Sequence, residues 1–206
     1  MIRATLTALA LMAATAATAQ DGGLYEDVPD PNAAFLRVIG ADLTAATVNG
    51  TSLEGLDTGI SPYVVITDAG DITVDADAQS STATVAPATF HTLLIAPDGT
   101  RTVVTDPLTL SPAQADVTFY NLSDIASVDL FVPQAKAKAL EGIAPGSGGS
   151  VALKAPLTLD FEARDGDTTL ATAPGIALER RQGVALVLRG SGGSYDLVSA
   201  PNAIAK

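Results

Sequence analysis

Two serines stand in glycine-rich stretches that could present a hydroxyl nucleophile. Ser147 lies in the stretch Gly146-Ser-Gly-Gly-Ser150, and Ser191 lies in Gly190-Ser-Gly-Gly-Ser194. A serine nucleophile needs a base within hydrogen-bond reach and donors for the oxyanion that forms. Neither stretch has the G-x-S-x-G pattern of a strand-to-helix nucleophile elbow. Flexible hairpin loops are therefore the favoured interpretation, and a transient acyl-carrier role for Ser191 or Ser147 is kept as an alternative.

The base of a Ser-His-Asp triad would have to be His91, because the chain contains one histidine. His91 lies inside the apolar run Phe90–Ile95, which is typical of a strand histidine with a satisfied hydrogen bond. Cysteine is absent, so disulfides, thiolate metal sites and a cysteine nucleophile are excluded. We therefore expect no catalytic residue, no metal site and no cofactor.

Several aspartates are close enough in sequence to suggest paired carboxylates. A glycosidase needs two carboxyl groups at a defined separation across a sugar-binding cleft, and aromatic residues make up only 4% of this chain. Asp165-Gly166-Asp167 could contribute to a calcium site, but the EF-hand pattern is missing. Turn aspartates are the favoured interpretation. The pairs are Asp27/Asp30, Asp68/Asp71, Asp75/Asp77 and Asp165/Asp167.

Aromatic platforms for sugar binding are scarce, because the chain has no Trp and four Tyr. Tyr195 directly follows a glycine loop and could be exposed. The candidates for contact with a partner or a sugar are Tyr25, Arg37 and Tyr195. Core or rim packing is the favoured interpretation for the tyrosines.

The charge balance is strongly acidic, with 11 basic and 23 acidic residues and a net charge of −12. Such a surface repels phosphate backbones and anionic lipid headgroups. Nucleic-acid binding and polybasic membrane docking are therefore not expected. The hydrophobic fraction of 47% is that of a globular protein, which excludes wholesale disorder.

The first residues have the pattern of a secretory signal peptide. Arg3 precedes the apolar run Leu6 to Ala14, and Ala17-Thr18-Ala19 matches a small-x-small cleavage site. We predict a signal peptide over residues 1–19 with cleavage after Ala19. No later segment approaches the roughly 18 apolar residues of a membrane helix, so a mature chain without a transmembrane span is expected. The mature chain is therefore predicted to be exported.

The mature chain is predicted to be all-β, because short Val-, Ile-, Leu- and Thr-rich runs alternate with turn residues. Asn49-Gly50, Asp98-Gly99, Asp165-Gly166 and Gly192-Gly193 supply the turn chemistry. Little helix is expected apart from the signal peptide. Ala135–Leu140 could form one or two helical turns, but its position favours a loop or a strand entry. The predicted strands are Phe35–Ile39, Ala46–Val48, Tyr63–Thr67, Asp71–Asp75, Thr82–Val85, Phe90–Ile95, Arg101–Thr105, Val117–Asn121, Ser127–Val132, Ser150–Lys154, Leu157–Ala163, Thr168–Ala171, Val184–Arg189 and Tyr195–Ser199.

An internal repeat divides these strands into two sets. Leu53-Glu-Gly-Leu56 matches Leu140-Glu-Gly-Ile143 at an offset of 87 residues, and Leu36-Arg-Val38 aligns with Val117-Thr-Phe119 at an offset of 81. Asp98 to Pro107 likewise aligns with Gly192 to Pro201. The sequence therefore predicts two tandem small β-sandwiches of jelly-roll or immunoglobulin-like type. We place the N-terminal domain at residues 20–107 and the C-terminal domain at residues 108–206.

A colinear set of short motifs runs along essentially the whole mature chain. Its members are Leu24-Tyr25, Pro29, Pro31, Ala34-Phe-Leu-Arg-Val38, Val117, Asn121-Leu-Ser123, Val187-Leu-Arg-Gly-Ser-Gly192 and Pro201. This set resembles the AlgF family of alginate biosynthesis proteins, and the N-terminal motifs from Leu24 to Val38 are the most telling part of the match.

This resemblance implies a periplasmic accessory protein of exopolysaccharide O-acetylation, built from two β-sandwich-like domains. The resemblance also implies that the protein acts together with a membrane-bound acyltransferase and with periplasmic O-acetyltransferases that acetylate O-2 and O-3 of mannuronate. No catalytic residue carries over, so a non-catalytic adaptor is expected. A carbohydrate-binding module remains a further alternative, although the acidic charge disfavours direct contact with a polyanionic polymer. A neutral glucan is therefore also left open as the polymer.

Overall fold

The computed structural model describes residues 32–205, and every regular element within that range is a β-strand. The first half of the chain contains β1 (Ala34–Gly40), β2 (Ala46–Val48), β3 (Thr51–Ser52), β4 (Val64–Ile66), β5 (Gly70–Ala76), β6 (Gln79–Val85), β7 (Phe90–Ile95) and β8 (Arg101–Asp106). The second half contains β9 (Gln114–Ser123), β10 (Val128–Val132), β11 (Ala137–Ile143), β12 (Ser147–Lys154), β13 (Leu157–Asp165), β14 (Thr168–Leu178), β15 (Val184–Ser191) and β16 (Ser194–Pro201). The all-β prediction is confirmed.

The two halves have the same topology, which confirms the predicted repeat. Each half holds two four-stranded sheets, in the orders β4-β1-β7-β8 and β3-β2-β5-β6 in the first and β12-β9-β15-β16 and β11-β10-β13-β14 in the second. β1 runs parallel to β7 just as β9 runs parallel to β15, and the other pairings are antiparallel. Leu36-Arg-Val38 and Val117-Thr-Phe119 fall on the equivalent strands β1 and β9. The other matched motif follows β3 in the first half and ends β11 in the second, and its glycines, Gly55 and Gly142, share a positive φ of 72° and 68°.

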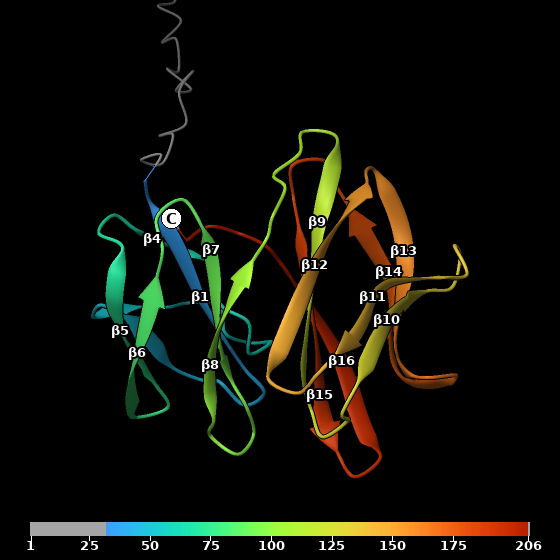
Figure 1. The fold of residues 1–206 in the computed structure, drawn as a ribbon, viewed down its shortest axis with the longest axis horizontal. Coiled ribbons are helices and arrows are strands. Elements are labelled where there is room, and N and C mark those ends of the chain that lie inside the picture. The colour runs from blue at the N-terminus through green and yellow to red at the C-terminus, as the bar shows by residue number, and fades with distance from the viewer. Residues whose placement is uncertain (1–31, 206) are drawn as a thin grey trace, which may run out of the picture.

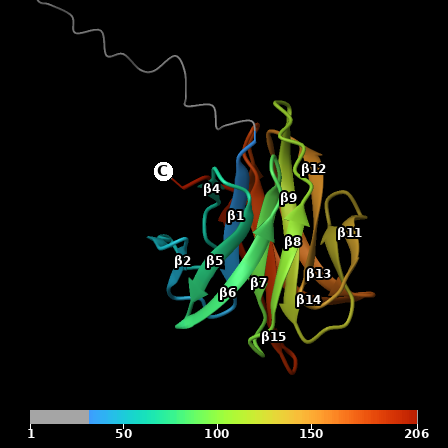
Figure 2. The same cartoon turned by 60° about the vertical axis from the view of Figure 1, so that its left-hand side comes forward.

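The two sandwiches stand side by side, as Figure 1 shows, with their sheets stacked in layers that are also visible in Figure 2. One face of β1 and one face of β9 each point into the apolar core of their own sandwich. The opposite faces meet between the halves, where Ile39 and Leu94 pack against Tyr120, Leu122 and Ala185. Because both of its faces are covered, every residue of β1 is buried.

The end of the chain crosses from the second sandwich back to the first. The amide of Tyr63, just before β4, donates to the carbonyl of Ala203 at 2.8 Å, and the amide of Ala205 donates to the carbonyl of Tyr63 at 2.7 Å. Figure 1 shows this terminus lying beside β4. The C-terminal tail (residues 202–205) therefore adds two backbone hydrogen bonds that join the halves.

Two edge strands, β3 and β11, were not predicted as strands. Both residues of β3 and four of the seven residues of β11 are exposed, so neither strand has the apolar run that marks a buried strand in a sequence. Residues 133–136 form a turn and β11 begins at Ala137, which confirms the favoured expectation of a loop or strand entry at Ala135–Leu140. Within residues 32–205 no helix has the length and apolar character needed to cross a bilayer. The predicted domain bounds, 20–107 and 108–206, stay a prediction.

Candidate functional site at the junction of the two sandwiches

Arg37 lies at the centre of the junction, because its position in β1 directs its side chain to the face that meets the second sandwich. Its side chain has an exposed fraction of 0%. Nη2 donates to the hydroxyls of Thr118 at 3.0 Å and Tyr120 at 2.7 Å, both in the second half. Nη1 donates to Oδ1 of Asn202 at 2.6 Å. A single guanidinium thus donates to three side chains of the other sandwich.

Asp106, at the end of β8, is the buried carboxylate of the same cluster and is 4% exposed. Its oxygens accept hydrogen bonds from the hydroxyls of Tyr63 at 2.8 Å, Thr92 at 2.6 Å and Tyr120 at 2.5 Å. Its Oδ2 atom lies 4.0 Å from Nη2 of Arg37. Three hydroxyl donors and a nearby cation replace the water that this charge loses on burial.

The two tyrosines of the cluster stay protonated and act as donors. Burial raises the pKa of Tyr120 to about 12 and raises the pKa of Tyr63 as well, while the Arg37 charge opposes both shifts. Burial lowers the pKa of Arg37, but Tyr120, Tyr63 and Asp106 more than offset it, so the guanidinium stays charged. Its Cζ atom lies 4.3 Å from the centroid of the Tyr63 ring, within cation–π range.

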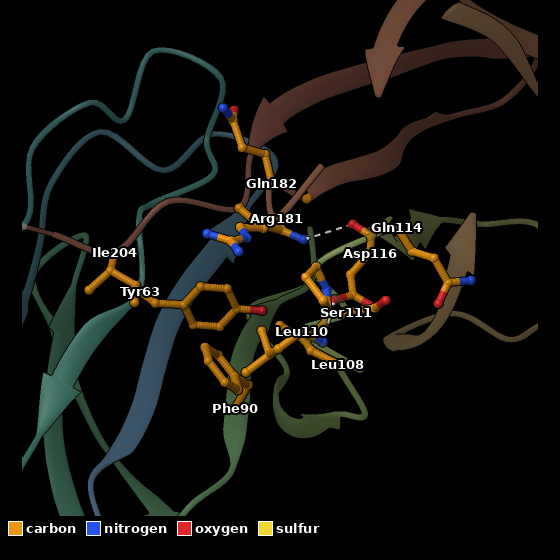
Figure 3. A pocket seen from close by; sticks show the side chains of 13 residues that line it. Tyr63, Phe90, Leu108, Leu110, Ser111, Gln114, Asp116, Arg181, Gln182 and Ile204 are labelled. Carbon is orange, nitrogen blue, oxygen red and sulfur yellow. Dashed lines mark hydrogen bonds between the residues drawn. The ribbon is translucent and has the colours of Figure 1, made fainter. Parts of the chain in front are cut away.

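A pocket of about 310 Å³ opens beside this cluster (Figure 3). Tyr63 and Asn202 belong to both the cluster and the pocket wall. The other walls are the connection between the halves, the turn before β15 and the C-terminal tail. Its lining residues are Tyr63, Phe90, Leu108, Leu110, Ser111, Pro112, Gln114, Asp116, Arg181, Gln182, Gly183, Asn202 and Ile204.

The sequence-predicted contact residues do not gather in one place. Arg37 has no exposed surface, so direct contact with a partner or a sugar would require the junction to open. Tyr195 is half-buried on β16, and its hydroxyl donates to Oδ1 of Asp124 at 2.8 Å. This hydrogen bond to a carboxylate raises the pKa of Tyr195. Tyr25 lies outside the described residues.

The two candidate serines lie in the second half. Ser147 begins β12, and its hydroxyl donates to the carbonyl of Ala144 at 2.6 Å. Ser191 is exposed and pairs with Ser194 at the tip of the β15–β16 hairpin. His91 lies in the first half, on β7, and is 5% exposed. The strand position of His91 is confirmed, and its Nε2 atom accepts from the amide of Ala86 at 3.1 Å.

Three of the four aspartate pairs lie in the described part of the chain. Asp71, Asp75 and Asp77 accept hydrogen bonds from threonine hydroxyls. Asp77 lies in the turn after β5, as predicted, but Asp71 and Asp75 lie within β5, so the turn prediction is wrong for these two. Asp165 and Asp167 flank the turn between β13 and β14. Asp27 and Asp30 lie outside the described residues. Among residues 32–205 no group of three or more metal-ligating side chains is placed to hold an ion.

Sequence reasoning identified Arg37 but missed the residues that bind it. A charge inside the apolar run Ala34–Gly40 is a signal for a buried, partnered group, but it does not name the partners. Asp106, Tyr120 and Asn202 come from three other strands or strand ends. Only the packing of one half on the other brings them together.

The fold and the junction define a class of protein: a tandem pair of matched β-sandwiches whose facing sheets share one buried polar cluster. Comparison with known proteins gives the family. The family model described as "Alginate O-acetyl transferase AlgF" matches residues 6–185, and the chain belongs to the AlgF family.

Two relatives that match over most of their length agree with this assignment. The chain is 28% identical to the alginate biosynthesis protein AlgF of Pseudomonas aeruginosa over 184 residues, covering 88% of this chain and 84% of that protein. It is 26% identical to the alginate biosynthesis protein AlgF of Pseudomonas fluorescens over 184 residues, which again cover 88% of this chain and 84% of that protein. Solved structures of the C-terminal and N-terminal domains of Pseudomonas aeruginosa AlgF are each 25% identical to it, with TM-scores of 0.38 and 0.31. They cover 43% and 36% of this chain, and 98% and 93% of their own length.

Proposed function

We propose that this chain is an exported, non-catalytic accessory protein of exopolysaccharide O-acetylation, with alginate as the polymer. In this role it binds periplasmic O-acetyltransferases and a membrane-bound acyltransferase, which add acetyl groups at O-2 and O-3 of mannuronate. The AlgF family membership supports the pathway. The signal-peptide pattern of residues 1–19 supports export to the periplasm.

The buried junction is the observation that favours an adaptor. Arg37 donates to side chains of the second sandwich from inside the first, and Tyr120 of the second donates to Asp106 of the first. Buried polar groups are costly unless they are all paired, so this cluster favours one relative position of the halves. A fixed pair of sandwiches presents its outer surfaces to partners in constant geometry.

The surroundings of the serines support a role without acetyl transfer. The hydroxyl of Ser147 already donates to a backbone carbonyl, and Ser191 lies at a hairpin tip. The ring nitrogens of His91 face Ala86, Thr89 and Thr105 in the first half. An ester relay would need a base that reaches one of these serines.

Gene deletion and complementation test the proposal. We expect deletion to remove O-acetyl groups from the polymer, as measured by proton NMR of the isolated polysaccharide. A variant with both Ser147→Ala and Ser191→Ala should restore acetylation, whereas failure of this variant to restore it would favour the acyl-carrier alternative. Affinity capture from a detergent extract with the wild-type chain should retain an O-acetyltransferase. Unchanged acetylation after deletion would overturn the proposal.

A further inference from the structure

We propose that the pocket between the two sandwiches binds a segment of a partner polypeptide that presents a large apolar side chain next to a carboxylate. This inference deepens the proposed adaptor function, on which it rests, by naming the chemistry that a partner must offer. It starts from three features of the pocket: its apolar walls, its exposed rim and its cation.

The walls of the pocket suit one anchoring side chain. Tyr63 and Phe90 meet edge to face with ring centroids 5.1 Å apart, and Leu108 packs against the same small apolar cluster. The volume of about 310 Å³ is at the low end of the range for ligand pockets. Interfaces place their strongest contacts where one large side chain fills such a pocket.

The rim of the pocket exposes apolar surface to solvent. Three large hydrophobic side chains are exposed among the described residues, and two of them, Leu110 at 64% and Ile204 at 44%, line this pocket. The third, Leu157, lies on β13 and lines none of it. Exposed apolar side chains grouped around a concave site are typical of an interaction surface.

Leu110 is held in its exposed position by a buried carboxylate. Its φ of 50° is a left-handed conformation that a leucine rarely adopts. Asp116, which is 8% exposed, accepts from the amide of Leu110 at 2.9 Å and from the amide and hydroxyl of Thr109 at 3.0 and 2.7 Å. Backbone strain maintained by the surrounding fold is concentrated at binding sites.

Arg181 supplies a cation at the pocket that the described residues do not neutralise. Its φ is 63°, and its amide donates to the carbonyl of Gln114 at 3.2 Å. Figure 3 shows its guanidinium turned away from Gln114 and Asp116. No ion pair within residues 32–205 involves Arg181. The carboxylate of Asp116, which lines the same pocket, is already engaged by three donors and does not pair with Arg181. We therefore assign to the partner the carboxylate that would pair with Arg181.

The polar groups of the pocket favour a polypeptide over a sugar. Sugar hydroxyls need several free donors and acceptors, but Asn202 already bonds Arg37 and the Asp116 carbonyl. The side chain of Gln114 donates to the Ala152 carbonyl, and that of Gln182 donates to Glu179. One cation beside an apolar cavity matches an acidic residue adjacent to a large apolar residue.

Methyl NMR of the purified chain tests the site with the peptide acetyl-GSFDSG-amide. We expect the methyl signals of Leu110 and Ile204 to shift and those of Leu157 to stay unchanged. The matched peptide acetyl-GSFNSG-amide should bind about fivefold more weakly, because it lacks the carboxylate for Arg181. The variant Arg181→Gln should bind the two peptides equally, whereas Arg180→Gln, with the same change in net charge, should keep the difference.

Shifts that include Leu157, equal affinity of the two peptides for the wild-type chain, or stronger shifts with mannuronate oligomers would overturn this assignment. Affinity capture separates it from the proposed function. If acetyltransferase capture succeeds and survives both Arg181→Gln and Leu110→Ser, the adaptor function stands and the pocket is not its docking site. If the peptides bind as expected but nothing is captured and acetylation survives deletion, the pocket stands and the proposed function fails.

Discussion

The Nη2 atom of Arg37 lies 3.0 Å from the Oγ1 atom of Thr118, its counterpart 81 residues later in the repeat. Arg37 pairs with Thr92 of the parallel strand β7, and Thr118 pairs with Ala185 of the parallel strand β15. Equivalent positions that meet each other are typical of a two-fold interface. The two halves therefore pack as a duplicated pair would, but a cation in one meets a hydroxyl in the other.

Replacing Arg37 by methionine should destabilise the chain by about 3 kcal/mol. The variant removes the cation nearest to Asp106 and leaves the acceptors of Thr118 and Asn202 without their donor. Urea unfolding followed by circular dichroism measures the loss. Lys154→Met is the matched control, because Lys154 is exposed and its side chain makes no hydrogen bond or ion pair within residues 32–205, and it should change the free energy of unfolding by about 0.5 kcal/mol or less.

Adding Asp106→Asn to the Arg37→Met variant should recover part of that loss. In the Arg37→Met variant the buried Asp106 carboxylate keeps its hydroxyl donors but loses its nearby cation. Asp106→Asn then removes that unbalanced negative charge. Strictly additive losses in the double variant would contradict an electrostatic coupling between Arg37 and Asp106.

Gly148→Ala should destabilise the junction, whereas Gly149→Ala should be tolerated. A Cβ atom at Gly148 would collide with the ring of Tyr120, which then could not keep its bonds to Arg37 and Asp106. A Cβ atom at Gly149 would approach Ile143 Cδ1 at 3.3 Å, the end of a flexible side chain. We expect a cost of about 1–3 kcal/mol for the first variant. Thermal unfolding of both variants measures it, and equal melting temperatures would refute the close approach of Tyr120.

Asn202→Ala should weaken the connection between the C-terminal tail and the first sandwich. The change removes the acceptor of Arg37 Nη1 and leaves a buried donor unpaired, which costs about 1–3 kcal/mol. Hydrogen exchange of the Tyr63 and Ala205 amides should become faster, because these amides hold the tail in place. Gln182→Ala is the control at an exposed amide nearby. Unchanged exchange at both amides in Asn202→Ala would show that the tail is held without Asn202.

Stability should fall as the pH drops below about 6.5, the ordinary pKa of histidine. Burial lowers the pKa of His91, against the opposing effect of the Asp106 charge. At a pH between the pKa of His91 in the folded chain and its pKa in the unfolded chain, His91 is protonated mainly in the unfolded chain. The stability that is present above pH 6.5 is therefore lost as the pH falls toward the pKa of His91 in the folded chain.

The denaturation midpoint of the wild-type chain between pH 5 and 8 tests this, with His91→Gln as the comparison. The variant should show a flatter dependence in that range, because the chain has no other histidine. Identical pH profiles for the two proteins would mean that His91 titrates alike in the folded and unfolded chains.

Strand positions were predictable because the strands have both a β-branched interior and turn residues at their ends. Phe90–Ile95 and Ala46–Val48 were predicted with their observed bounds. The hairpin between β5 and β6 lacked a glycine signal, since Asp77 and Ala78 adopt φ values of 49° and 63° without one. Turn type there follows from the pairing of two strands rather than from the local residues.

The junction and its pocket were beyond the reach of sequence reasoning. Leu110 and Arg181 are ordinary loop residues in the printed sequence, and their left-handed backbones result from hydrogen bonds to Asp116 and Gln114. The cluster around Arg37 likewise depends on how the sheet that contains β1 packs against the sheet that contains β9. Periodicity along one strand reports that a face is buried but not what covers it.

The C-terminal tail has a mechanical consequence. A purely apolar contact between two sheets could slide, but a shift by one residue, about 3.3 Å, would break the bonds of Arg37, Asp106 and the tail together. Proteins attached to the outer sheets of the two halves would consequently be kept at a set separation, with the chain acting as a spacer between them.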